Sequence, residues 1–516
     1  MNLKLKKSLL KPEAYPEPTT SVRLIETHVS LLFVTDSYVY KVKKPVDFGF
    51  INFSTVDRRR FYCGEEVRLN RRLSPDLYLG VEEIRERSGA FSIGGTGQVV
   101  DYAVKMRRLP EERMLHRLID NGEAGEEELR LVAGTVARFH LEAPRAGVSQ
   151  SFGTVAAVRE NWEENFRTVE GMPWISRADF ALIRDFVSRF AKEKAHLFEE
   201  RLHAGFVREC DGDLHLENIC LTDRVYIFDC IEFSERLRIC DTAADIAFLL
   251  MDLEYHDRGD LSPPFLQTYR EITGDSGMDP LLDFYKSYRA FVRGKVSGLL
   301  LREKLEEPER LRVEGRARRY FRLSRGCALR GKLPPSLFLT CGLTGSGKST
   351  IALELTRQLG CELYQSDPVR KRQAGIPAGV RADAPHGEGI YSADFDRSVY
   401  DELLGLAAEA LRRGKSVVVD ATFRRAADRS RFRALAGAAG VPCHILEVRC
   451  DEGTVRERLE RRHADPRAPS DGRWEIYLAQ KERFEPPRDE GEILLDGALP
   501  PEECADRVLR AVGVLT

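Results

Sequence analysis

Alternating apolar and polar positions near the start of the chain predict a small sheet. The runs 29–34 and 38–42 alternate and flank Thr35-Asp36-Ser37, a turn-forming tripeptide, so we expect a β-hairpin there. A polar, helix-favouring stretch follows at 58–73. Three further strand-like runs lie at 78–84, 90–93 and 99–106. Together these elements predict a small α+β lobe over residues 1–110.

Helical periodicity dominates the next part of the chain. It extends from residue 111 to about 206, most clearly at 126–140, and returns from 242 to about 329. A compact strand-rich insert at 207–233 separates the two helical stretches. We therefore expect a helical large lobe over residues 111–330.

The pattern breaks at Gly331-Lys332-Leu333-Pro334-Pro335 and restarts as strand, glycine loop and helix. This break predicts a third domain over residues 331–516. The total of 516 residues agrees with about three domain-sized units of roughly 150 residues each.

Composition limits the classes of partner. The chain has 80 Lys+Arg and 82 Asp+Glu, a formal charge of -2, so no overall field attracts it to nucleic acid or to an anionic membrane. Such binding would need a local basic patch. No run of about 18 uncharged apolar residues occurs, and the first residues lack the apolar core of a signal peptide. We expect a cytoplasmic protein without a membrane segment.

A phosphate-binding loop follows the first strand of the third predicted domain. The run 337–340 reads as a buried strand, Gly342 to Thr350 matches GxxxxGK[ST], and a helical pattern follows from 351. Backbone N–H groups of such a loop surround phosphates at a helix N-terminus. We expect Lys348 to neutralise the β- and γ-phosphates and Ser349 to offer its hydroxyl to Mg²⁺. The candidate nucleotide-binding residues are Gly342, Thr344, Gly345, Ser346, Gly347, Lys348, Ser349 and Thr350.

Two aspartates end the next strand-like runs of this domain. The run 361–365 leads to Asp367, and 416–419 leads to Asp420. Ligands of open parallel sheets bind beyond the carboxyl ends of the strands, so both carboxylates should lie near the phosphate loop. Asp367 could accept the proton of an alcohol during phosphoryl transfer, or it could simply cap a helix. Asp420 could orient a water on Mg²⁺ or fix an arginine.

Residues 337–487 resemble the small P-loop kinases related to polynucleotide kinase and to zeta-toxin kinases. The resemblance lies in Gln365-Ser366-Asp367 with Arg370, and in Val418 to Thr422. It implies that Asp367 and Arg370 belong to the catalytic site, and that a lid supplies arginines to the transferring phosphoryl group. Arg458 and Arg462, four apart on the helix-like run 452–462, are the candidates, with Arg461 and Arg467 nearby. A solvated helical face is the alternative for these arginines.

The strand-rich insert carries a second set of candidate residues. Asp213, an asparagine five residues later at 218, and Asp229 at the end of the next strand have the spacing that a kinase-like catalytic loop requires. In such a loop the first carboxylate orients the acceptor hydroxyl, and the asparagine and the second aspartate hold Mg²⁺.

This segment resembles the aminoglycoside phosphotransferase and choline-kinase-like families. The resemblance implies that Asp213 is the catalytic base, that Asn218 and Asp229 are metal ligands, and that Asp245 braces the catalytic loop. One departure is Asp211, which occupies the place of the family's histidine.

In the small lobe, Tyr40-Lys41-Val42-Lys43 resembles the strand that presents the ATP-contacting lysine of the same families. The resemblance implies that Lys41 contacts ATP and that Glu66 is its partner on a helix. Lys41 is favoured over Lys43 because the family's lysine directly follows the apolar strand.

The whole order resembles the bacterial proteins described as bifunctional aminoglycoside phosphotransferase/ATP-binding proteins. It implies a multidomain fold with an N-terminal bilobal, α+β, protein-kinase-like part and a C-terminal α/β P-loop kinase with a parallel sheet. The function expected is that of a bifunctional phosphotransferase that uses ATP and Mg²⁺ at two sites, with hydroxyl-bearing acceptors that the sequence does not name.

Two alternatives remain at this stage. One is a 5′-hydroxyl polynucleotide kinase in the C-terminal domain, for which Asp367, Arg370 and the arginine-rich stretch 310–332 would meet nucleic acid. The other is a catalytically silent, regulatory N-terminal domain, for which Asp211 is the motive. The sequence leaves the oligomeric state open.

Overall fold

The chain folds into two compact units. The structure is a computed structural model that describes residues 3–49, 51–147, 151–302, 305–376, 389–464 and 473–515. Contacts divide it into Met1–Ser324 and Arg325–Thr516, within the helix α12 (Glu307–Leu329). In the described part of the chain, no helix combines the length and the apolar character needed to cross a membrane.

The first unit begins with a six-stranded antiparallel sheet in the order β1-β2-β3-β6-β4-β5. The predicted hairpin is confirmed, with Val34 paired to Val39 across the turn. The sheet was predicted except for its edge strand β1, which is short and mostly exposed and therefore has no clear alternation. The elements of this small lobe are α1 (Leu3–Ser8), β1 (Arg23–Glu26), β2 (Ser30–Val34), β3 (Tyr38–Lys43), α2 (Val56–Asn70), β4 (Tyr78–Arg87), β5 (Ala90–Ile93) and β6 (Gln98–Arg107).

The alternation of β3 decides which of its side chains can act chemically. Tyr40 and Val42 are fully buried in the core of the small lobe with Leu31 and Phe33. Because successive strand residues point to opposite faces, Lys41 and Lys43 lie on the other face, where they meet α2. The helix thus covers the face of the sheet that carries both lysines.

The large lobe is a helical body around one apolar core. Its central helix α9 (Thr242–Tyr255) is buried at every position from Thr242 to Leu253, as expected of a helix that is apolar on all sides. The surrounding helices are α3 (Leu115–Asp120), α4 (Glu126–Glu142), α5 (Val155–Val169), α6 (Arg177–Glu193), α7 (Ala195–His203), α8 (Glu235–Arg238), α10 (Ser262–Thr273) and α11 (Asp279–Leu300).

Two short antiparallel ladders frame the predicted catalytic loop. β7 (Val207–Glu209) pairs with β10 (Ile239–Asp241), and β8 (Ile219–Leu221) pairs with β9 (Val225–Ile227). The loop 210–218 lies between β7 and β8, and Asp229 follows β9. The strand-rich insert predicted from the sequence is therefore the platform of this loop.

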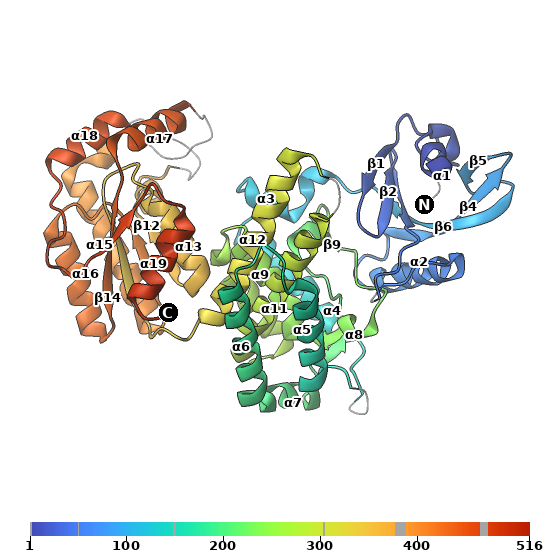
Figure 1. The fold of residues 1–516 in the computed structure, drawn as a ribbon, viewed down its shortest axis with the longest axis horizontal. Helices are drawn as coiled ribbons and strands as arrows, with labels where there is room; N and C mark the ends of the chain where they lie inside the picture. The colour runs from blue at the N-terminus through green and yellow to red at the C-terminus, as the bar shows by residue number, and fades with distance from the viewer. Residues whose placement is uncertain are drawn as a thin grey trace. The chain divides into compact units, whose positions relative to one another are not determined.

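The second unit is a three-layer α/β/α domain. Its five strands are all parallel and lie in the order β12-β13-β11-β14-β15. Figure 1 shows the sheet between α13 and α19 on one side and α15 and α16 on the other. The elements are β11 (Leu337–Cys341), α13 (Lys348–Leu359), β12 (Glu362–Gln365), α14 (Ser366–Gln373), α15 (Ala393–Arg412), β13 (Val417–Asp420), α16 (Ala426–Ala439), β14 (Cys443–Arg449), α17 (Glu452–Ala464), α18 (Trp474–Glu482), β15 (Ile493–Asp496) and α19 (Pro501–Ala511).

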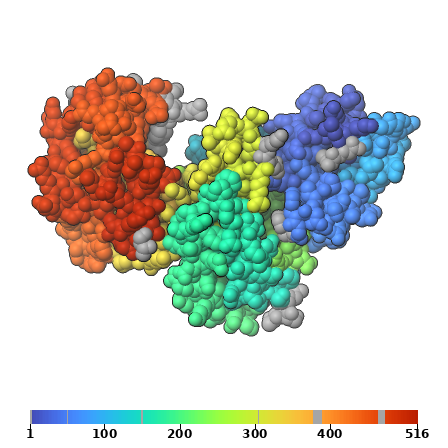
Figure 2. All heavy atoms as spheres, in the orientation of Figure 1, coloured from blue at the N-terminus to red at the C-terminus, as the bar shows by residue number. Residues whose placement is uncertain are grey.

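Both faces of this sheet are buried, which explains the continuous apolar runs of its central strands. Leu337 and Leu339 pack with α15 and α16, whereas Phe338 and Val418 pack with α13 and α19. In the space-filling view this unit, coloured from yellow to red, presents a continuous outer face (Figure 2). The rigid sheet brings the loops at its carboxyl edge together.

Candidate active sites

The phosphate loop of the second unit connects β11 to α13. Gly342 and Gly347 have φ values of 143° and 99°, which favour glycine. A Cβ at Gly342 would lie 2.4 Å from the carbonyl oxygen of Val448 on the neighbouring strand. The loop therefore needs glycine at 342 both for its backbone conformation and for its close approach to β14.

Lys348 begins α13 and is buried at the mouth of the loop. Its Nζ donates to the carbonyl oxygen of Leu343 at 2.7 Å. Burial lowers the pKa of Lys348, and the charge of Arg462 acts in the same direction. A phosphate group beside the amine would favour its charged form.

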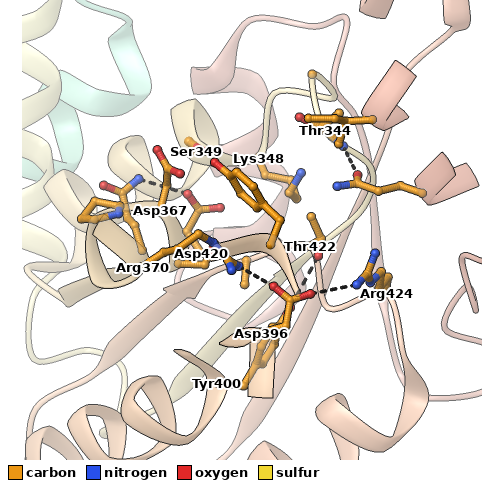
Figure 3. A pocket seen from close by; sticks show the side chains of 18 of the residues that line it. Thr344, Lys348, Ser349, Asp367, Arg370, Asp396, Tyr400, Asp420, Thr422 and Arg424 are labelled. Carbon is orange, nitrogen blue, oxygen red and sulfur yellow. Dashed lines mark hydrogen bonds and ion pairs between the residues drawn. The ribbon is translucent and has the colours of Figure 1, made fainter. Parts of the chain in front are cut away.

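The loop opens into a cavity of about 450 Å³ (Figure 3). Its walls include Lys348 and Ser349, and the two aspartates predicted at the strand ends, Asp367 and Asp420. The sheet thus brings together residues that are up to 72 positions apart in the chain (420 − 348). Thr344, Gly345 and Gly347 also line the cavity, whereas Gly342, Ser346 and Thr350 are not among its lining residues.

Asp420 is held by two side chains. Its Oδ1 accepts from Thr340 Oγ1 at 2.9 Å, and its Oδ2 accepts from Gln365 Nε2 at 3.0 Å. Thr340 is on β11 and Gln365 ends β12, and these two strands are the neighbours of β13 in the sheet. The Asp420 carboxylate is therefore fixed at the carboxyl ends of the strands.

Asp367 lies in the first turn of α14. The N-cap residue of this helix is Gln365, so the helix-cap alternative for Asp367 does not hold. Lys371 Nζ, one turn later, lies 3.5 Å from Asp367 Oδ2 and is almost completely buried. Lys371 therefore places a buried positive charge beside the candidate proton acceptor.

Arg458 and Arg462 of α17 both lie close to the phosphate loop. Arg462 lines the cavity, and Arg458 NH1 lies 3.4 Å from the position that a Cβ on Gly347 would occupy. Arg461 is exposed, and Arg467 lies outside the described residues. Val455 and Leu459 of the same helix pack beside Gly345 and fix α17 against the loop.

Other residues of this site carry no motif and escaped sequence reasoning. Gln480 Oε1 accepts from the backbone N–H of Thr344 at 3.0 Å. Asp396 of α15 bonds Arg370 of α14 at 2.7 Å. Arg424 lies four residues after the end of β13. Because ligands of open parallel sheets bind at the loops that follow the strands, its position could have marked it as a candidate site residue.

The arginine-rich stretch 310–332 does not present all its charges to solvent. Arg318 pairs with Glu314 at 2.8 Å, Arg319 pairs with Asp257 at 3.3 Å, and Arg325 pairs with Asp506 at 2.6 Å. These partners reduce the charge that this stretch could offer to nucleic acid.

In the first unit, the catalytic loop brings Asp213 and Asn218 together. Asn218 Nδ2 donates to the Asp213 carbonyl oxygen at 3.1 Å and to Asp213 Oδ2 at 3.3 Å. His215 Nε2 lies 3.5 Å from Asp213 Oδ2. Burial raises the pKa of Asp213, but His215 and the charge of Arg293 outweigh it and hold this pKa below its ordinary value. Asp213 is therefore an ionised carboxylate at neutral pH.

Asp245 holds the backbone of the catalytic loop, and the predicted bracing contact is confirmed. Asp245 accepts from the backbone N–H groups of Asp211 at 3.2 Å and of Gly212 at 2.8 Å. His140 Nε2 lies 3.1 Å from Asp245 Oδ2, and its Nδ1 lies 2.8 Å from the Tyr269 hydroxyl. His140, which belongs to none of the sequence motifs above, is part of this brace.

Asp211 is buried within the loop. Burial and the neighbouring carboxylates of Asp245 and Asp213 raise the pKa of Asp211 well above its ordinary value. The same surroundings favour the neutral form of the Asp211 side chain over its charged form. This weakens the motive for regarding the domain as silent.

Lys41, Glu66 and Asp229 meet although they come from three distant segments. Lys41 Nζ lies 2.8 Å from Glu66 Oε1 and also pairs with Asp229. Burial opposes the charge of Lys41, but Asp229 and Glu66 outweigh it and raise its pKa well above its ordinary value. Phe228 N donates to the Asn218 carbonyl oxygen at 3.1 Å, which places Asp229 beside the catalytic loop.

Lys43 also reaches Glu66, at 2.5 Å, and pairs with Glu232. Its side chain is 1% exposed, against 12% for that of Lys41. Of the two lysines, Lys41 is the more accessible one and the one that contacts Asp229.

The folds of the two units define a two-part protein: a bilobal unit with an antiparallel sheet and a helical lobe, and a P-loop unit with a parallel sheet. The predicted fold class is confirmed. A family model described as an AAA domain matches residues 337–487.

Uncharacterized proteins of Mycobacterium bovis and of two strains of Mycobacterium tuberculosis are 32% identical to the chain over 473 residues. The match covers 90% of this chain and 91% of each of those proteins. The chain belongs to the same family as these mycobacterial proteins.

Solved structures match more distantly. A sugar kinase of Janibacter sp. HTCC2649 is 22% identical, with 36% of this chain and 99% of that chain covered and a TM-score of 0.26. A Plasmodium vivax ethanolamine kinase is 12% identical, with 59% and 81% covered and a TM-score of 0.37.

Proposed function

We propose that the chain is an ATP-dependent phosphotransferase with two sites, one in each unit, each of which transfers the γ-phosphate of ATP to a hydroxyl acceptor. The observation that carries the proposal is the cavity shared by Lys348, Ser349, Asp367 and Asp420. It combines a phosphate-binding loop with a carboxylate able to take up a proton, which phosphoryl transfer to an alcohol requires.

The donor atoms at both sites fit Mg²⁺, a hard cation that prefers oxygen ligands. In the second unit, Ser349 and Asp420 would hold the ion. In the first unit, Asn218 donates its amide nitrogen to Asp213, and its Oδ1 would hold the ion together with Asp229. When bound, the ion would neutralise charge on the transferring phosphate.

In the second unit, the acceptor oxygen forms a bond to the γ-phosphorus while the bond from that phosphorus to the β,γ-bridging oxygen breaks, and ADP leaves. Asp367 takes the proton of the acceptor hydroxyl. Lys348, with Arg458 and Arg462, stabilises the negative charge of the transferring group.

In the first unit, the same exchange of bonds would use Asp213 as the proton acceptor. Lys41, oriented by Glu66, would contact the phosphates of ATP. The support is the convergence of Lys41, Glu66 and Asp229 beside the loop that carries Asp213 and Asn218.

The test is transfer of labelled γ-phosphate from ATP to pooled sugars, aminoglycosides, nucleosides and 5′-hydroxyl oligonucleotides. We expect Asp213→Asn to abolish one set of products and Lys348→Ala another. Asp223→Asn and Lys415→Ala, at exposed positions outside both sites, are the matched controls. Products that depend on Lys348 alone would contradict activity of the first unit. Labelling of oligonucleotides with a steep salt dependence would instead identify the second unit as a polynucleotide end-kinase.

A further inference from the structure

One wall of the cavity in the second unit is built from residues outside the phosphate loop. Asp396, in the first turn of α15, lies between two arginines (Figure 3). Its Oδ1 lies 2.7 Å from Arg370 NH2, and its Oδ2 lies 2.9 Å from Arg424 NH2. All three side chains line the cavity.

The two arginines are held differently. Arg370 also donates to the Ile390 carbonyl oxygen at 2.6 Å, and its guanidinium lies over the ring of Tyr391. Its side chain is 9% exposed, whereas that of Arg424 is 21% exposed. Arg424 is therefore the guanidinium of this pair that is more available to a molecule in the cavity.

The charges of this cluster of three side chains do not cancel. Asp396 is one carboxylate against two guanidinium groups. Of the neighbouring ionic groups, Arg425 pairs with Asp428 at 2.9 Å and Asp367 lies 3.5 Å from Lys371. Asp420 is held by Thr340 and Gln365 and is the carboxylate proposed to hold Mg²⁺. Within the cluster of Asp396, Arg370 and Arg424, one positive charge is left uncompensated. A ligand with one negative charge would balance it.

A strained turn directs Arg424 into the cavity. Phe423 has a φ of 42°, which a bulky residue rarely adopts. Its N–H donates to the Tyr400 hydroxyl at 3.1 Å, and its carbonyl oxygen accepts from Arg429 NH1 at 2.9 Å. Its ring is fully buried between those of Tyr400 and Phe432.

The strain persists because the surroundings of Phe423 fix it from several sides. The turn buries Phe423 and leaves the residues on either side of it, Thr422 and Arg424, on the wall of the cavity. Strained backbone of this kind concentrates at ligand-binding positions. This observation points to Arg424 independently of the charge count.

We propose that Arg424, oriented by Asp396 and by the Phe423 turn, binds an anionic group of the phosphoryl acceptor. The acceptor is a small hydroxyl compound with one carboxylate or phosphate monoester, whose hydroxyl reaches Asp367 while its anionic end contacts Arg424. The inference rests on the proposed kinase activity of the second unit and names the acceptor class of that site.

The rest of the cavity agrees with a small polar acceptor. A volume of about 450 Å³ lies within the usual range for sites of small molecules, and part of it must receive the phosphates of ATP. Thr422 and Tyr400 offer hydroxyl groups on the same wall. Burial raises the pKa of Tyr400 to about 12, so its hydroxyl stays neutral and can bond the hydroxyls of the acceptor.

The test uses three matched series as acceptors: short linear polyols, the aldonates of the same chain length, and the corresponding polyol monophosphates. Phosphoryl transfer is measured with the full-length wild type, Arg424→Gln, Arg424→Lys and Lys348→Ala. Arg431→Gln is the matched control, because Arg431 pairs with a single carboxylate, Asp401, and does not line the cavity.

We expect the wild type to prefer one anionic series over the neutral polyols in kcat/KM. Arg424→Gln should raise the KM of that series by roughly 10- to 100-fold and remove the preference, with the KM for ATP unchanged. Arg424→Lys should keep part of the preference because it keeps the charge but loses the planar fork. An unchanged thermal midpoint of Arg424→Gln would exclude misfolding as the cause.

The two anionic series distinguish a carboxylate from a phosphate as the group that is bound. Lys348-dependent transfer that is as efficient with neutral polyols would overturn the anionic subsite and leave the proposed kinase intact. An equal loss for neutral and anionic acceptors in Arg424→Gln would overturn it as well. Absence of any Lys348-dependent transfer would overturn the proposed function, and the subsite with it.

Discussion

Lys43 on β3 forms a buried ion pair with Glu232, three residues after the candidate metal ligand Asp229. The pair joins the small lobe to the loop that follows β9. Glu66 of α2 contacts both Lys43 and Lys41, so two lysines and three carboxylates form one cluster. With Lys43 engaged by Glu232, Lys41 is the lysine that pairs with Asp229, as the proposed phosphate contact requires.

Removing Lys43 should therefore destabilise the first unit more than neutralising Glu232. Lys43→Met leaves Glu232 and one oxygen of Glu66 buried without their cation, which should cost about 3–5 kcal/mol. Glu232→Gln should cost less, because Lys43 keeps Glu66 and the cluster loses its excess negative charge. Urea unfolding of the full chain, followed by hydrogen exchange of the β3 amides, measures the difference. A larger loss in Glu232→Gln than in Lys43→Met would contradict this charge balance.

Asp211 should make the stability of the first unit decrease as pH rises. Its pKa is raised in the folded chain from an ordinary value of 3.8, so the folded state binds more protons than the unfolded state. The stability that this proton provides is complete below the ordinary value and is lost as pH rises through the raised one. Asp211→Asn removes the titration.

Unfolding of wild type and Asp211→Asn across the pH range checks this, with Asp223→Asn at an exposed position as control. The stability difference between Asp211→Asn and wild type should grow with rising pH in favour of the variant. A difference that is independent of pH would show that Asp211 titrates normally in the folded chain.

Two glycine substitutions in the second unit should have opposite effects. A Cβ at Gly342 would lie 2.4 Å from the Val448 carbonyl oxygen at a φ of 143°, so Gly342→Ala must shift the phosphate loop. It should weaken ATP binding and destabilise the unit by about 1–3 kcal/mol. Gly405 lies within α15 with no atom within 4 Å of its Cβ position, and Gly405→Ala should stabilise the unit by about 0.5–1 kcal/mol. Calorimetry and ATP titration of both variants decide between these effects, and equal signs would refute the argument.

Local patterns predicted the elements that bear the candidate sites, but not the long-range contacts that complete them. The hairpin of Lys41 and the phosphate loop are short-range features, so alternation and glycine spacing were sufficient. Glu232 lies 189 positions from Lys43 in the chain, and no periodicity connects them. The link between Asp396 and Arg424 likewise depends on α15 packing beside β13, which only the folded sheet determines.

Residue type alone also misled where burial changes the chemistry. Asp211 was the motive for a silent N-terminal domain, yet its burial next to Asp245 raises its pKa and favours its neutral form. His140 belongs to no sequence motif, although it contacts Asp245 in the fold. Both outcomes depend on which side chains the tertiary structure brings together.

The brace beneath the catalytic loop gives a last prediction, because His140 touches Asp245 but none of the proposed reacting groups. Without His140, the buried carboxylate of Asp245 loses a partner and holds the N–H groups of Asp211 and Gly212 less firmly. His140→Phe should therefore lower the kcat of Asp213-dependent transfer about 10-fold or more, with little change in the KM for ATP, and destabilise the first unit by about 1–3 kcal/mol. His203→Phe, at an exposed position on α7, is the control and should leave both quantities unchanged.

His140→Gln, which can still bond Asp245, should recover part of the kcat. If both variants of His140 lose stability but keep the wild-type kcat, His140 supports only the fold of the lobe and does not position Asp213.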